Sequence, residues 1–128
     1  MAQYHDRVQL SCPDHVPPVM TDAGLAQVVL SNLLSNSIKY AAPKSVPVIE
    51  VKASETHLTV KFSNKISHPL RAPDRLTEKY FRDPSTTGKS GTGLGLYLAN
   101  LLCEQLGHGL ELSETTDQFT AKIKFQIA

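Results

Sequence analysis

Residues 22–40 read DAGLAQVVLSNLLSNSIKY, a pattern that predicts one long helix. Asp22 is a typical N-cap residue, because its carboxylate accepts a hydrogen bond from a free backbone N–H group of the first turn. At about 100° per residue, small and apolar side chains gather on one face, the predicted core stripe: Ala26, Leu30, Leu34, Ser37 and Ile38. This face is expected to pack against another element of the fold.

The opposite side of the predicted helix carries Asn32, Asn36 and Lys39. Leucine and valine residues border these three, so we expect this polar side to be half-buried. An asparagine oxygen is an uncharged ligand that suits a hard cation such as Mg²⁺, and a lysine one turn on suits phosphate groups. The alternative is that the two amides bond to neighbouring backbone groups while the lysine points into solvent.

A second helix is predicted from Thr92 to about Leu106, with Gly107 as its natural end. Before and across its start, residues 91–96 read GTGLGL, and three alternate glycines let a backbone approach a ligand closely. The free N–H groups and the dipole at a helix start favour an anion there. A flexible loop capped by glycine is the simpler alternative, but it explains one glycine more easily than three.

The rest of the chain predicts strands, from side chains that alternate between apolar and polar. They cover residues 8–12, a hairpin of 48–53 and 58–63, and a final pair of 110–114 and 119–127. Residues 76–81 are expected to form one or two helical turns, and residues 83–91 a loop. Mostly antiparallel strands with helices between them predict an α/β (α+β) two-layer sandwich, a single sheet covered by helices on one face.

Composition indicates a globular domain without an obvious charged partner. Of 128 residues, 41% are apolar and 20% charged, and 13 Lys and Arg oppose 12 Asp and Glu, so no global charge attracts nucleic acid. No apolar run approaches the roughly 20 residues of a membrane-spanning helix. Neither cysteine belongs to a CxxC pair, and no His/Cys cluster has the spacing of a zinc site. We therefore expect a soluble intracellular domain.

Three segments, taken together and in order, resemble sequence boxes of the ATP-binding catalytic domain of bacterial sensor histidine kinases, in the GHKL or Bergerat-fold superfamily. Residues 32–40 (NLLSNSIKY) are similar to the N-box, residues 76–82 (LTEKYFR) to the F-box, and residues 91–96 to the second glycine box. The resemblance implies a mixed, mostly antiparallel sheet under about three helices. It also implies that residues 1–128 form one catalytic domain, without the helical dimerisation and phosphoacceptor domain.

The resemblance further implies a protein-histidine kinase that uses ATP and Mg²⁺ in two-component signalling. The γ-phosphoryl group would pass to a histidine on a separate helical hairpin of the parent kinase, and then to a response regulator, so the domain alone would be inactive. Isolated, it is expected to be a cytoplasmic monomer that contacts neither membrane nor nucleic acid directly, whether or not the parent is anchored in the inner membrane.

Residue roles follow from the same resemblance. Asn36 would coordinate Mg²⁺ with Asn32 in support, while Lys39 would contact phosphate. Tyr40 would lie along the nucleotide. Two further cations would neutralise the γ-phosphate region: Arg82 and Lys89. Backbone amides of the glycine box would cradle the phosphates: Gly91, Thr92, Gly93, Leu94, Gly95 and Leu96. The implied catalytic set is Asn32, Asn36, Lys39 and Arg82.

One box departs from the family pattern. The first glycine box, Asp-x-Gly-x-Gly, should follow the strand at 58–62, but residues 64–68 read NKISH. An asparagine can accept from the adenine amino group and donate to the adjacent ring nitrogen, so Asn64 is the candidate for base recognition. Two alternatives of the same fold stay open: a nucleotide-poor docking or regulatory module, and a protein-serine kinase of the anti-sigma type.

Overall fold

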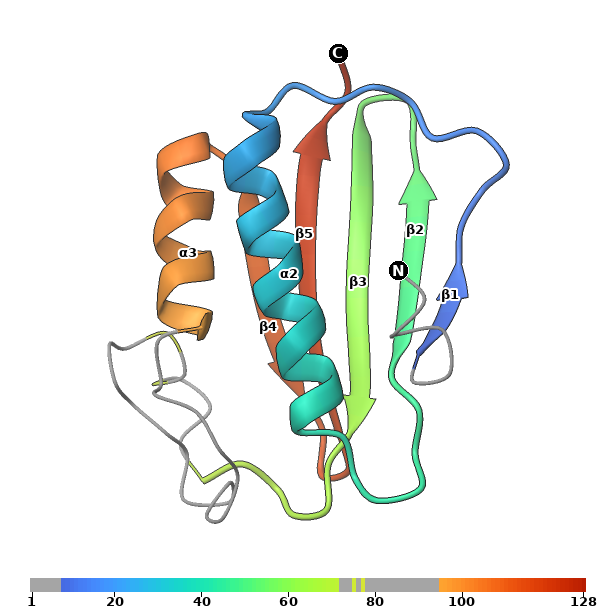
Figure 1. Ribbon diagram of the computed structural model, residues 1–128, viewed down its shortest axis with the longest axis vertical. Helices are drawn as coiled ribbons and strands as arrows, with labels where there is room; N and C mark the ends of the chain where they lie inside the picture. Colours follow the sequence, from blue (N-terminus) through green and yellow to red (C-terminus); the bar gives the residue numbers. More distant parts are fainter. Residues whose placement is uncertain (1–7, 72–74, 76, 78–94) are drawn as a thin grey trace.

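The computed structural model describes residues 8–71, 75, 77 and 95–128, and these form a sheet with helices on one face (Figure 1). The elements are β1 Gln9–Ser11, α2 Ala23–Lys39, β2 Val48–Ala53, β3 His57–Lys65, α3 Gly95–Leu106, β4 Gly109–Glu114 and β5 Gln118–Gln126. The predicted two-layer α/β sandwich is confirmed. The helical turns predicted at 76–81 fall almost entirely outside the described residues.

The sheet has five strands in the order β1-β2-β3-β5-β4. β1 pairs with β2 in parallel, because α2 carries the chain across the sheet between them, and the other neighbouring strands are antiparallel. The sheet is therefore mixed and mostly antiparallel, as predicted. On β3 the core-facing positions are Leu58, Val60 and Phe62, and Asn64 continues this series at the end of the strand.

α2 begins where the sequence predicts, because Oδ1 of Asp22 accepts a hydrogen bond from the backbone N of Leu25 at 3.0 Å. Its core face is rotated from the predicted one. The buried residues of the helix are Ala26, Val29, Leu33 and Ser37, of which Ala26 and Ser37 belong to the predicted stripe. Leu30 and Leu34 only flank this face. Since residues seven apart differ by about 20° on a helix, Asn36 lies beside Val29, at the edge of the core.

α3 ends at Gly107, as predicted, and this glycine has a φ of 75°. The predicted start at Thr92 lies outside the described residues, and α3 is described from Gly95. Ala99, Leu102 and Cys103 face the core. Burial raises the pKa of the Cys103 thiol to about 11, so this cysteine is a packing residue and stays protonated at neutral pH.

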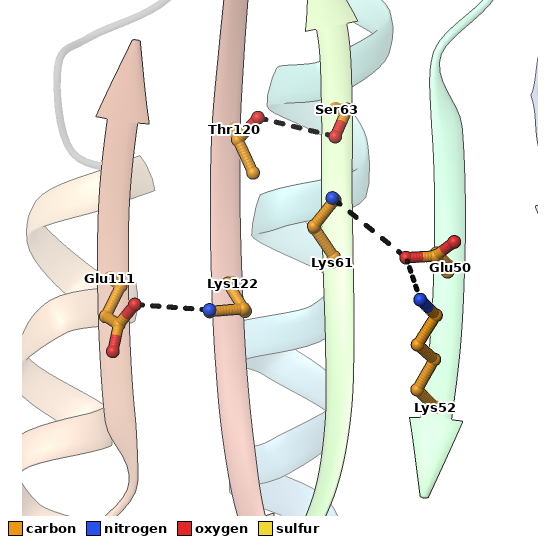
Figure 2. Close-up of polar contacts among 7 residues, drawn as sticks. All are labelled: Glu50, Lys52, Lys61, Ser63, Glu111, Thr120 and Lys122. Atoms are coloured by element: carbon orange, nitrogen blue, oxygen red, sulfur yellow. Dashed lines mark hydrogen bonds and ion pairs between the residues drawn. The ribbon is translucent and has the colours of Figure 1, made fainter.

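The sheet face opposite the helices is polar (Figure 2). Oε1 of Glu50 lies 3.6 Å from Nζ of Lys52 and 4.0 Å from that of Lys61, and Nζ of Lys122 lies 3.3 Å from Oε2 of Glu111. Antiparallel sheets commonly leave one such face to solvent. In the part of the chain that the structure describes, no helix is long and apolar enough to cross a membrane.

Candidate functional site

The candidate site lies at one end of the sandwich, where α2 and β3 end and α3 begins (Figure 1). Asn36, in the last turn of α2, packs its side-chain amide against Gly95, the first described residue of α3. A Cβ added to Gly95 would lie 3.4 Å from Oδ1 and 3.5 Å from Nδ2 of Asn36. The polar side of α2 thus meets the glycine-rich start of α3, two segments that are far apart in the sequence.

The three polar residues of α2 are half-buried, as predicted: Asn32, Asn36 and Lys39. Nζ of Lys39 lies 5.8 Å from the centroid of the Tyr40 ring, within the range of a cation–π contact. The backbone carbonyl of Asn36 accepts a hydrogen bond from the backbone N of Tyr40 at 3.0 Å, which closes the helix. An ammonium group and an amide oxygen are therefore presented one turn apart, on a partly desolvated surface.

Asn64 connects the end of β3 to the end of α2. Its side chain is buried, and Nδ2 donates to the backbone carbonyls of Tyr40 at 3.4 Å and Lys65 at 3.2 Å. The carbonyl of Lys65 also accepts a hydrogen bond from the backbone N of Ala42 at 2.7 Å. The sequence also led us to expect that Asn64 donates to a ring nitrogen of adenine. Because Nδ2 already has two protein acceptors, such a bond would replace one of them.

Ser37 is a buried polar residue that the sequence placed in the core stripe without a partner. Its Oγ donates to the backbone carbonyl of Leu33 at 2.9 Å, the bond that a helical serine makes to the preceding turn. Among the described residues, no buried side-chain nitrogen or oxygen lacks a hydrogen-bond partner. The polar groups around the candidate site are therefore satisfied, and their burial carries no desolvation penalty that remains uncompensated.

Several residues predicted for the site lie outside the described part of the chain: Arg82, Lys89, Gly91, Thr92, Gly93 and Leu94. Of the glycine box, Gly95 and Leu96 are described, and Leu96 packs against the core. The structure therefore brings together Asn36 and Gly95 from one predicted cluster, and joins Asn64 to Tyr40 in a second contact at the same end.

The oxygen ligands at this end of the fold are too few to hold a cation without further ligands from outside the protein. Within the described ranges, no group of three or more His, Cys, Asp or Glu side chains could hold a metal ion. Asn36 offers an uncharged oxygen, and a hard cation completes its shell with water and anionic oxygens. Gly95 has no side chain, so no Cβ lies against the amide there, where one would stand 3.4–3.5 Å from it. The residues present therefore fit a Mg²⁺ ion that arrives bound to phosphates.

Residues 21–127 match the family described as histidine kinase-, DNA gyrase B-, and HSP90-like ATPase. The chain is 34% identical over 107 residues to sensor protein BceS of Halalkalibacterium halodurans, which covers 82% of this chain and 32% of that protein. It is 32% identical over 108 residues to sensor histidine kinase GraS of Staphylococcus haemolyticus, which covers 80% of this chain and 30% of that protein. The chain thus spans about a third of the length of these relatives.

Solved structures agree on the fold. The mycobacterial sensor histidine kinase MprB superposes with a TM-score of 0.79 at 17% identity, over 94% of this chain and 83% of that one. The catalytic domain of histidine kinase ThkA gives 0.79 at 16% identity, over 98% and 85%. Full-length ShkA, solved in complex with AMPPNP, gives 0.76 at 16% identity, over 95% and 26%. The chain therefore belongs to the histidine kinase-, DNA gyrase B-, and HSP90-like ATPase family, as the ATP-binding catalytic domain of a sensor histidine kinase.

Proposed function

We propose that this domain binds Mg²⁺–ATP where α2 ends and α3 begins, and that it transfers the γ-phosphoryl group to a histidine on a separate helical domain of its parent kinase. The observation that supports this most is the contact between the Asn36 amide and Gly95. It puts a metal-binding type of oxygen beside the first described turn of α3, toward the end of the helix whose N–H groups favour an anion. The downstream partner is a response regulator, which takes the phosphoryl group from the histidine.

Each polar residue of the described site has a proposed role. Asn36 supplies an oxygen ligand to Mg²⁺, and Asn32, one turn earlier, supports it. Lys39 contacts phosphate, Tyr40 lies along the nucleotide, and Asn64 contacts the adenine base. When bound, Mg²⁺ would neutralise charge on the phosphate oxygens. The protein groups hold the nucleotide in one orientation, which is how phosphoryl-transfer sites lower most of the barrier.

The remaining roles are proposed from the sequence. Arg82 and Lys89 neutralise the γ-phosphate region, and the backbone amides of residues 91–96 cradle the phosphates. In the transfer, a nitrogen of the acceptor histidine forms the new bond to the γ-phosphorus while the bond to the bridging oxygen breaks and ADP leaves. One turn before Asn32 the helix carries Val28 and Val29 rather than an acid. The base for this step is therefore supplied by the phosphoacceptor domain.

A transfer assay tests this function. The domain is mixed with Mg²⁺–ATP labelled at the γ-phosphate and with the purified helical phosphoacceptor domain of a close relative. We expect label on the acceptor that is stable to alkali and lost in acid, as for phosphohistidine, and no label with an Asn36→Ala variant. Label on a serine of a small partner protein would favour the anti-sigma alternative. Nucleotide binding without any transfer would favour a docking module.

A further inference from the structure

The side-chain amide of Asn64 has one fixed orientation in this fold. The residue is 4% exposed, and Nδ2 lies 3.4 Å from the carbonyl oxygen of Tyr40 and 3.2 Å from that of Lys65. A carbonyl oxygen only accepts hydrogen bonds, and Nδ2 is the only donor of the side chain, so these two neighbours decide which branch of the amide faces them. The amide is therefore held by its nitrogen.

The orientation determines what Asn64 can offer to a ligand. Two acceptors use both N–H groups, and Oδ1 is the atom that remains. A group that meets Oδ1 has to donate a hydrogen bond. The amino group of a 6-aminopurine does so, whereas the carbonyl of a 6-oxopurine would set one acceptor against another.

We infer that Asn64 is a positioning residue that requires a neutral amide, and that a carboxylate cannot replace it in this chain. Its N–H groups tie β3 to the end of α2 that carries Asn36 and Lys39, so base recognition and phosphate binding share one support. The part that concerns the base rests on the proposed function. The requirement for a neutral side chain rests on the hydrogen bonds alone.

An aspartate at position 64 would place an oxygen against the carbonyls of Tyr40 and Lys65, away from water. The charged form is disfavoured there by burial and by both acceptors, and a proton relieves one of the two clashes. An aspartate in the unfolded chain ionises near pH 4, whereas the folded variant would hold its proton to higher pH. The folded variant therefore loses stability as the pH rises from about 4 to that raised pKa.

The neighbouring titratable groups do not reverse this expectation. Among the described residues they are Lys39 and Tyr40 at the end of α2 and Lys65 on β3, while Phe119, opposite Asn64 on β5, carries no charge. Lys39 holds its Nζ at 5.8 Å from the centroid of the Tyr40 ring. Lys65 is exposed and alternates to the polar face of the sheet. Neither lysine is set against position 64 to neutralise a carboxylate.

The first arm of the test measures thermal unfolding at pH 5 and pH 8 without nucleotide. Asn64→Asp is expected to unfold further below the wild type at pH 8 than at pH 5, by at least about 5 °C. Ser63→Ala, next along β3, removes only a 3.4 Å contact with Thr120 and should show no such change. Equal stability of Asn64→Asp and wild type at both pH values would overturn the inference, and so would a loss of stability that is the same at pH 5 and pH 8. A variant that is unfolded at pH 8 but folded at pH 5 would support it.

The second arm measures the affinities of Mg²⁺–ADP and Mg²⁺–IDP at pH 8. Wild type and Ser63→Ala should prefer ADP, and Asn64→Leu, which removes Oδ1, should bring the ratio of the two affinities toward one. Equal losses for both nucleotides in Asn64→Leu would mean a merely structural role and would overturn the inference about the base. If the wild type bound neither nucleotide, the proposed function would fail. The first arm would still test whether position 64 requires an uncharged side chain.

Discussion

At the scale of single residues, the candidate site depends on the contact between Gly95 and Asn36. A Cβ on Gly95 would meet the Asn36 amide at 3.4–3.5 Å, which is ordinary van der Waals contact. The glycine is therefore not needed for α2 and α3 to pack. An added methyl group would instead lie against the amide itself, where it would compete with a ligand of Oδ1.

Gly95→Ala should thus separate folding from binding. Alanine favours a helix by up to about 1 kcal/mol over glycine, so the unfolding midpoint is expected to stay or rise. The affinity for Mg²⁺–ADP is expected to fall by about tenfold or more, the effect of losing one well-placed polar contact. Calorimetric titration and thermal unfolding check both parts. Gly109→Ala is the control, since its Cβ would have nothing within 4 Å; undiminished binding by Gly95→Ala would contradict the assignment.

At the scale of elements, the start of α2 depends on one side chain. Oδ1 of Asp22 accepts a hydrogen bond from the backbone N of Leu25 at 3.0 Å, and alanine cannot replace this bond. Asp22→Ala is expected to lower the free energy of unfolding by about 1 kcal/mol. Urea unfolding measures this, with Asp14→Ala, an exposed aspartate outside every helix and strand, as the control. Equal losses in the two variants would mean that the cap does not stabilise the helix.

His108, just after α3, links three elements at the other end of the helices. Nε2 lies 2.7 Å from Oγ1 of Thr21, before α2, and the ring packs edge-on against Phe125 of β5, with centroids 4.8 Å apart. Burial lowers the pKa of His108 below 6.5, so the fold favours the neutral ring. The domain should therefore lose stability as the pH falls from about 7 through the lowered pKa.

A His108→Gln variant tests this pH dependence. Glutamine keeps a polar group near Thr21 but does not titrate, so the loss of stability between pH 7 and pH 5 is expected to be smaller in the variant than in the wild type. Urea unfolding at both pH values measures the difference. Parallel pH profiles would show that another group is responsible.

The sequence predicted elements better than it predicted their faces. Local chemistry is enough to place the start of α2 at Asp22 and the end of α3 at Gly107, and alternation is enough to find the strands. The core face of α2 was predicted only in part: Ala26 and Ser37 are buried as expected, but the centre of the face lies near Val29 and Leu33. That centre depends on how α3 and the sheet pack around the helix. The bond from Asn64 to the carbonyl of Tyr40 was not predicted either, since it joins residues 24 apart that meet only in the folded chain.

At the scale of the whole molecule, the two ends of the helices serve different purposes: one contributes to stability and the other to nucleotide binding. The core of the sandwich is apolar, with Val29, Leu33, Cys103 and Ile123 fully buried. His108, with its partners Thr21 and Phe125, lies at one end of α2 and α3, and the contact of Asn36 with Gly95 lies at the other (Figure 1). Changes at the first end should alter unfolding and leave nucleotide affinity unchanged, because no described contact joins the two groups.

The central claim is that the end of α2 and the start of α3 together bind a magnesium-chelated nucleotide. Calorimetric titration with ADP, with Mg²⁺ and then with a chelator, tests it most directly. We expect binding that needs the metal, falls by about tenfold or more in Asn36→Ala and is kept in Asn100→Ala, a truncation on α3 that removes only a 3.2 Å bond to Glu104. Binding that is equally tight without Mg²⁺ or in Asn36→Ala, or no binding at millimolar ADP, would contradict the claim.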